Sequence, residues 1–116
     1  MHDRITQLND LIRDILGEIL TREISLKEGV IITLSKVETA RNLRATRVFL
    51  SVLPIEDRPY VMKTLEHERR NIQLLFHRKL ATRPLPKVVF ALDTTEEKAD
   101  EVEHLLRTIH EENPLN

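Results

Sequence analysis

The sequence lacks cysteine and tryptophan and has only two glycines, one tyrosine and three phenylalanines among 116 residues. Without cysteine there is no disulfide, no cysteine metal site and no thiol nucleophile. Two glycines cannot build a glycine-rich phosphate loop. No apolar run approaches the ~20 residues that span a bilayer, and no basic-then-apolar leader opens the chain. We therefore expect a cytoplasmic protein that does not enter a membrane.

The composition is that of an ordinary soluble globular protein, with 41% hydrophobic and 32% charged residues. Its length predicts a single domain over residues 1–116. Charge is unevenly spread: residues 1–40 carry a net charge of −2, residues 41–87 of +7 and residues 88–116 of −6. A basic middle between acidic flanks predicts a surface divided by sign, which could bind a polyanion by counterion release. The alternative is that these charges only solvate helix faces and pair with each other.

Hydrophobic periodicity predicts the elements and their order. We expect helix over 3–22, strands over 30–39 and 46–53, a helical stretch over 60–81 that is broken at 66–71, a strand over 88–92 and a final helix from 93. A bulge is expected near Lys36, and Asn42 suits left-handed backbone in the turn before the second strand. The order α-β-β-α-α-β-α predicts an α+β two-layer sandwich, with helices on one face of three strands. The third strand should lie parallel to one of the first two.

Three further expectations concern single positions. Gly17, inside the first helix, suggests a close contact with another element. On the helix after residue 71, Leu74 and Gln73 should face outward. In the last helix, Thr94 and Glu97 form a capping-box pattern, and a stripe of apolar residues should be its buried face: Ala99, Val102, Leu105, Leu106 and Ile109.

No arrangement of residues points to catalysis, so we expect no enzyme activity, no cofactor and no metal. The five histidines lack the spacing of metal ligands. Binding chemistry rests instead on basic side chains, because arginine donates two hydrogen bonds at once to a phosphate. Few aromatic residues remain for base stacking, which favours recognition of RNA backbone and shape. The candidate RNA-binding residues are Arg41, Arg44, Arg47, Arg69, Arg70, Arg78, Lys79, Arg83 and Lys87.

Four stretches together resemble the ribosome-binding factor A family. They are the opening helix from Arg4 to Leu20, the strand Ile32–Glu38, the turn and strand Asn42–Leu53, and a closing signature formed by Arg83, Pro86, Phe90 and Asp93. The chain departs from the family pattern at Asn42, where Asp is usual, and at Thr46, where a small residue is usual. It also has Glu68-Arg69-Arg70 where the family has an Ala-x-Gly kink.

The resemblance implies a type II KH fold and a non-enzymatic ribosome assembly factor. Such a factor binds the small (30S) ribosomal subunit and its rRNA and assists late maturation and processing of 16S rRNA. Other assembly factors are further candidate partners, and we expect a monomer. Two alternatives stay open: a protein-interaction or dimerisation module of the same fold without RNA binding, and a small-molecule-binding domain, for which the sequence shows no pocket residues.

Overall fold

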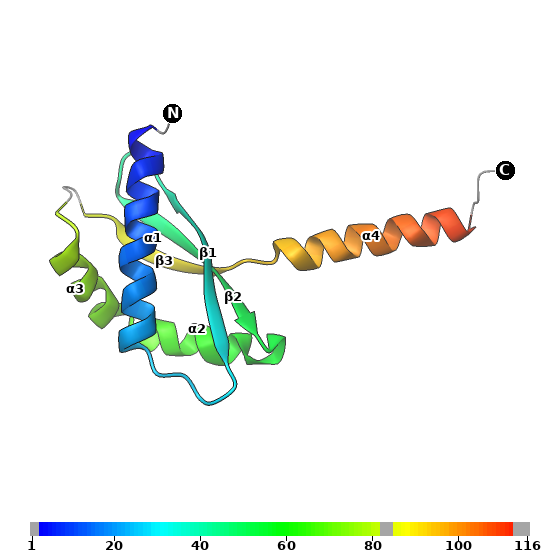
Figure 1. Cartoon of the computed structure of the whole chain (residues 1–116), viewed down its shortest axis with the longest axis horizontal. Coiled ribbons are helices and arrows are strands. Elements are labelled where there is room, and N and C mark those ends of the chain that lie inside the picture. The colour runs from blue at the N-terminus through cyan, green and yellow to red at the C-terminus, as the bar shows by residue number, and fades with distance from the viewer. Residues whose placement is uncertain (1–2, 82–84, 113–116) are drawn as a thin grey trace.

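A computed structural model of the chain describes residues 3–81 and 85–112 (Figure 1). Its elements follow the predicted order, with one short 3-10 helix added after the second strand. They are α1 (Arg4–Glu23), β1 (Ile31–Thr39), β2 (Ala45–Leu53), η1 (Ile55–Asp57), α2 (Arg58–His67), α3 (Arg69–Lys79), β3 (Lys87–Leu92) and α4 (Thr95–Glu112).

The sheet has the order β1-β2-β3 and mixed direction. Strands β1 and β2 are antiparallel, with Ile31 opposite Leu53, and the register shifts between Leu34 and Lys36. This shift confirms the predicted bulge. Strand β3 pairs with β2 in parallel, as expected for a strand reached by a helical crossover.

The core lies between one face of the sheet and the helices α1, α2 and α3. Alternate residues of β2 are buried on that face, as the strand period of two requires. The hydroxyls of Thr39 and Thr46 are buried there and lie 3.0 Å apart in a mutual hydrogen bond. The helices contribute apolar side chains that are at most 1% exposed: Ile12, Leu16, Val61, Leu65, Ile72 and Phe76. The predicted two-layer α+β sandwich is thus confirmed for α1–α3 and the sheet.

Helix α4 does not belong to that sandwich. It projects away from the body of the molecule (Figure 1), and its apolar stripe is exposed, so the expectation of a buried face was wrong. Only two residues separate β3 from α4. After this short connection the helix lies outside the layer that α1, α2 and α3 form against the sheet.

The start of α4 is held by contacts other than the expected capping box. The amide of Asp93 donates to the carbonyl oxygen of Leu50 at 2.8 Å. The Asp93 carboxylate accepts from the amide of Thr95 at 2.9 Å and from its hydroxyl at 2.6 Å. Glu97, expected to cap Thr94, instead forms an ion pair with Arg58 on α2. Asp93 therefore takes the capping role, because its carboxylate reaches the first free amide of the helix.

Lowering the pH should reveal how much the Asp93 carboxylate stabilises the fold. Hydrogen bonding from Thr95 lowers the pKa of the Asp93 carboxyl to about 2, from an ordinary value of 3.8. Because the folded pKa is the lower one, the ionised carboxylate stabilises the fold above about pH 4, and this contribution disappears as the pH falls toward 2. We expect the difference in Tm between the wild type and Asp93→Asn to shrink over that interval. A difference that stays constant from pH 6 to pH 2 would contradict this role.

Gly17 has no structural requirement for glycine. A β-carbon at this position would meet no other described atom within 4 Å, so the expected close contact is absent from the described part of the chain. Glycine inside a helix costs about 1 kcal/mol relative to alanine. We therefore expect Gly17→Ala to raise the free energy of unfolding by up to about 1 kcal/mol in urea denaturation. Gly29→Ala is the matched control and should destabilise, because Gly29 has a φ of +88°.

Candidate nucleic-acid interface

The turn between β1 and β2 presents two of the candidate residues, Arg41 and Arg44, both exposed. Asn42 closes the turn through its side-chain oxygen, which accepts from the amide of Arg44 at 3.0 Å. The left-handed position is Leu43, with a φ of 60°, and not Asn42 as expected. Asn42 acts through its side chain because an Asx-type hydrogen bond two residues onward stabilises the turn.

The start of β3 lies against this turn and against α3. The amide of Lys87 donates to the carbonyl oxygen of Arg44 at 3.0 Å. Gln73 of α3 bridges to the same strand: its side-chain NH₂ donates to the carbonyl of Pro86, and its side-chain oxygen accepts from the amide of Val88, both at 3.0 Å. Helix α3 is therefore held beside β3 by one amide side chain.

Gln73 is the positioning residue that sequence reasoning missed, since it was expected on the outside of α3. It is half-buried because β3 is an edge strand, and an edge leaves backbone donors and acceptors unpaired. The signal for such a residue is weak in a single sequence. An amide side chain at this place in a helix can face solvent or bind another element equally well. Only the position of β3 decides which of the two occurs.

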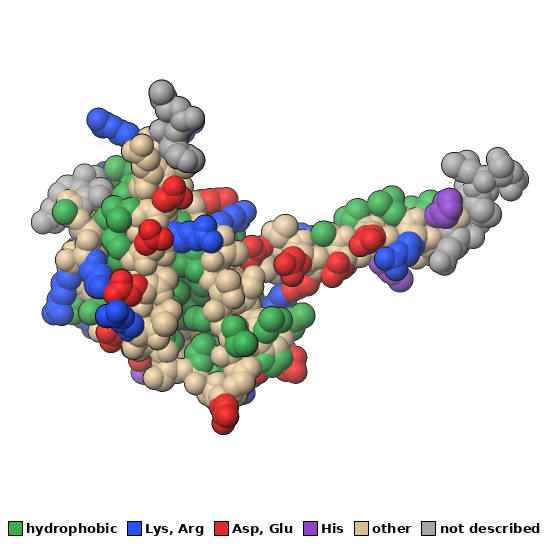
Figure 2. Space-filling model, in the orientation of Figure 1, with side chains coloured by type: hydrophobic (Ala, Val, Ile, Leu, Met, Phe, Trp, Pro, Cys, Tyr) green, Lys and Arg blue, Asp and Glu red, His purple; other side chains and the backbone are tan. Residues whose placement is uncertain are grey.

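The outer surface of α3 carries a cationic strip. Arg70, Leu74 and Arg78 follow one another at four-residue spacing, so they share one helix face, and all three are exposed. His77 is exposed beside them. We call these four residues the α3 strip. Leu74 is 51% exposed, which confirms its expected outward orientation. Figure 2 shows Lys and Arg side chains gathered on the side of the body where α3 lies.

The break between helices α2 and α3 contains no glycine. Glu68 has a φ of −89° and a ψ of 2°, a conformation that any L-residue can adopt. The replacement of the family's Ala-x-Gly by Glu68-Arg69-Arg70 is therefore compatible with two helices here. Arg69 pairs with Glu66 at 3.3 Å, and the two residues line a hollow of about 100 Å³ beside the edge of β3.

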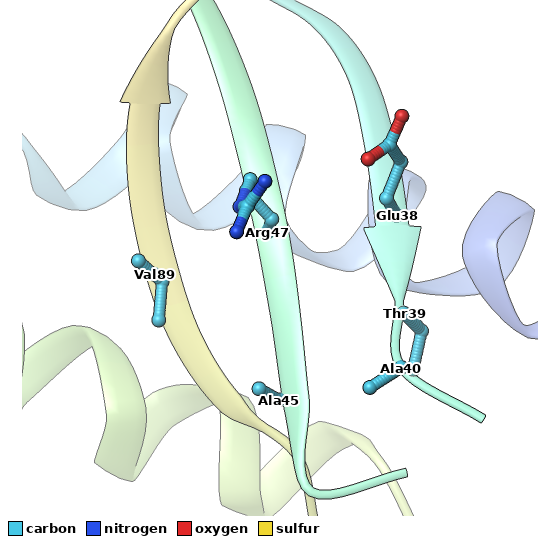
Figure 3. A pocket seen from close by; sticks show the side chains of 6 residues that line it. All are labelled: Glu38, Thr39, Ala40, Ala45, Arg47 and Val89. Atoms are coloured by element: carbon cyan, nitrogen blue, oxygen red, sulfur yellow. The ribbon is translucent and has the colours of Figure 1, made fainter. Parts of the chain in front are cut away.

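Arg47 lies apart from the α3 strip. It is exposed on the open face of the sheet, opposite Glu38 in the β1–β2 register. Together with Ala45 and Val89 it lines a shallow hollow of about 320 Å³, and Figure 3 shows these side chains on β2 and β3. A single RNA surface that docks along α3 would therefore not contain Arg47.

The structure thus joins some of the candidate residues and separates others. Lys87 and Arg44 are linked through their backbones, and Gln73 holds the strand bearing Lys87 against α3. Arg83 lies outside the described residues. Among those described, Arg69 and Lys79 form ion pairs, the latter with Glu18 of α1 at 3.6 Å. Six candidates form no ion pair with a carboxylate of residues 3–81 and 85–110: Arg41, Arg44, Arg47, Arg70, Arg78 and Lys87.

Two other kinds of site find no support in the described part of the chain. Its His, Asp and Glu side chains form no group of three or more that could hold a metal ion. None of its helices combines the length and the apolar character needed to cross a membrane. The exposed arginines near the edge strand suit phosphate oxygens.

Comparison with known proteins points to one family. The family model described as ribosome-binding factor A matches residues 4–106. Ribosome-binding factor A from Chlorobium phaeovibrioides is 30% identical over 119 residues, covering 100% of this chain and 99% of that protein.

Two solved structures share the fold. The crystal structure of ribosome-binding factor A from Thermus thermophilus matches with a TM-score of 0.69 and 14% identity, over 78% of this chain and 97% of that one. A Thermus thermophilus homology model of the same factor, fitted into a cryo-EM map of a 30S complex, matches with a TM-score of 0.62 and 16% identity. That match covers 76% of this chain and 93% of the other. At 14% and 16% identity these two matches show only that the fold is shared. That fold has the type II KH arrangement.

Proposed function

Because this chain belongs to the ribosome-binding factor A family, we propose that it is a non-enzymatic assembly factor that binds the small (30S) ribosomal subunit. It assists late maturation and processing of 16S rRNA in the cytoplasm, and the whole chain works as one domain. The observation that carries this proposal is the family match over residues 4–106. The Thermus thermophilus homologue that was fitted into the map of a 30S complex supports the choice of partner.

The docking surface that we propose is the α3 strip together with Lys87 and the β1–β2 turn. Exposed guanidinium groups without carboxylate partners are free to make paired hydrogen bonds to phosphate oxygens. Arg41, Arg44, Arg70 and Arg78 meet this description within the described residues. Base stacking contributes little, because Phe76 is fully buried in the core and Phe49 and Phe90 are half-buried in the sheet.

The action on the subunit follows from this mode of binding. A factor that contacts the phosphates of one rRNA arrangement, and contacts another arrangement less well, shifts the population toward the first. Only the difference in affinity between the two arrangements has an effect. The acidic helix α4 projects away from the body and so does not cancel the positive charge of the α3 strip.

The decisive experiment is co-sedimentation of the chain with immature small subunits at several salt concentrations. Binding to phosphates releases counterions, so the logarithm of the affinity should fall linearly with the logarithm of the salt concentration. A slope of about −3 to −4 is expected for four or five phosphate contacts. Salt-insensitive self-association in sedimentation, without retention on subunits, would instead identify a dimerisation module.

A further inference from the structure

Helix α4 presents an apolar stripe that no part of the described chain covers. Val102, Leu105, Leu106 and Ile109 are 56%, 59%, 62% and 58% exposed. They recur at three- and four-residue spacing, so they lie on one face of the helix. A helix with such a face normally packs it against another element. Figure 2 shows hydrophobic side chains along one side of α4 and carboxylates along another.

Both borders of this stripe are acidic. At 100° per residue, Glu96 and Glu103 lie along one border, and Glu101 lies along the other. Residues 95–112 hold seven Asp or Glu and two Lys or Arg, a net charge of −5. Of the two basic residues, Arg107 pairs with Glu103 at 3.4 Å. The stripe is therefore an apolar surface set in a negative potential.

A second feature of the same sign lies at the root of α4. A hollow of about 420 Å³ is lined there by Leu53 and Ile55 of the body and by four carboxylate residues: Asp93, Glu96, Glu97 and Asp100. Leu53 and Ile55 are 59% and 50% exposed. The basic residue in this lining, Arg58, is already paired with Glu97. At 100° per residue, Glu97 and Asp100 face away from the apolar stripe, so the hollow adds negative charge at the root of α4 but does not continue the stripe.

These charges decide which molecule fits. Nucleic acid is repelled by a helix of net charge −5, and so is the α4 of a second copy. If α4 folded back onto the chain's own sheet, it would disturb the contacts at its root. There Asp93 is hydrogen-bonded to Leu50 and Thr95, and Glu97 forms an ion pair with Arg58. A positively charged helix with its own apolar face can pack on the stripe and pair with the acidic side chains along its borders.

We propose that α4 is a docking helix for a cationic amphipathic helix of another protein. The apolar side chains of that helix pack on Val102, Leu105, Leu106 and Ile109. Its Lys and Arg side chains lie beside Glu96, Glu101 and Glu103. This binding surface is separate from the α3 strip, and the proposal does not depend on the ribosomal function.

The test uses the full chain and a synthetic 18-residue helical peptide built from Leu and Lys at amphipathic spacing. A second peptide with Glu in place of Lys serves as the charge control. Calorimetric titration should show binding of the Lys peptide and at least tenfold weaker binding of the Glu peptide. Backbone amide NMR shifts caused by the Lys peptide should map to residues 95–110.

Variants of exposed residues separate the apolar from the electrostatic contribution. Leu105→Asp with Leu106→Asp should weaken the Lys peptide at least tenfold, whereas Leu74→Asp, at an equally exposed leucine, should not. Glu101→Lys with Glu103→Lys should also weaken it at least tenfold. The control for the second pair is Asp10→Lys with Asp14→Lys on α1, which changes the net charge equally at exposed sites and should have less than a threefold effect.

Several results would overturn the proposal. These are peptide binding that survives Leu105→Asp with Leu106→Asp, equal binding of the two peptides, and NMR shifts confined to the body. A dimer in sedimentation that the same variant dissociates would assign α4 to a second copy instead. Nuclear Overhauser contacts between α4 side chains and the sheet in the free chain would show that the helix folds back on its own sheet. Each of these results leaves the co-sedimentation test with small subunits unaffected, so the two proposals fail separately.

Discussion

Charge reversal at Arg70 and Arg78 is expected to lower the affinity for the small subunit by at least tenfold near physiological salt. Both guanidinium groups are exposed on one face of α3 and have no carboxylate partner among the described residues. Replacing each by Glu removes a phosphate contact and adds a repulsive charge. The salt slope of log affinity should become shallower by about 2, about 1 for each lost phosphate contact. Co-sedimentation with immature subunits across salt concentrations measures both quantities.

The matched control is Arg47→Glu with Arg107→Glu. This pair changes the net charge by the same amount but lies on the open sheet face and on α4. Its expected effect is less than threefold, because it alters only the long-range field of the protein. An equal loss of affinity for the small subunit in the two double variants would mean that net charge, and not the α3 strip, controls binding. An unchanged salt slope in Arg70→Glu with Arg78→Glu would remove α3 from the interface.

Truncation of Phe76 is expected to have the largest effect on stability. Phe76 is fully buried and faces the core from the same helix that carries the α3 strip on its outside. A buried Phe→Ala substitution typically costs about 3–5 kcal/mol, through lost transfer free energy and the cavity that remains. For a domain of this size that corresponds to a decrease in Tm of roughly 12–20 °C. Calorimetry or urea denaturation measures the change.

Leu74→Ala on the same helix is the control for this substitution. Leu74 is 51% exposed, so its truncation should change the free energy of unfolding by less than about 0.5 kcal/mol. If Phe76→Ala lowered the free energy of unfolding by less than about 1 kcal/mol, this would contradict the packing of α3 described above. At temperatures where Phe76→Ala is still folded, its subunit binding should match the wild type, because the strip lies on the opposite side of the helix.

Local patterns in the sequence were sufficient for most of the fold. Residue periodicity located α1, the strands and the break between α2 and α3, because burial of an amphipathic face dictates a period of 3.6 or 2. The break in hydrophobic phase near Lys36 predicted the bulge that is observed. Topological rules then made β3 parallel to one of its predecessors. The resemblance in four separate stretches was enough to indicate the family.

The position of the basic residues was less predictable. Sequence distance grouped Arg41, Arg44 and Arg47 at one turn, but strand alternation turns Arg47 toward the open sheet face, away from α3. Gln73 could not be recognised from its own neighbours, because its partners are backbone groups of β3, 13 and 15 residues away. Hydrogen bonds of this kind depend on which strand becomes the edge of the sheet.

The amino-acid pattern alone determined which residues of each helix are apolar and the order of the main elements, since those properties depend on near neighbours. It also determined the uneven distribution of charge along the chain. Whether an apolar face is covered was decided only by tertiary structure. The faces of α1 and α4 have the same periodicity, yet the sheet covers the first and nothing described covers the second. The physical reason is that burial needs a complementary surface: α1 lies on the sheet, whereas α4 projects away from it.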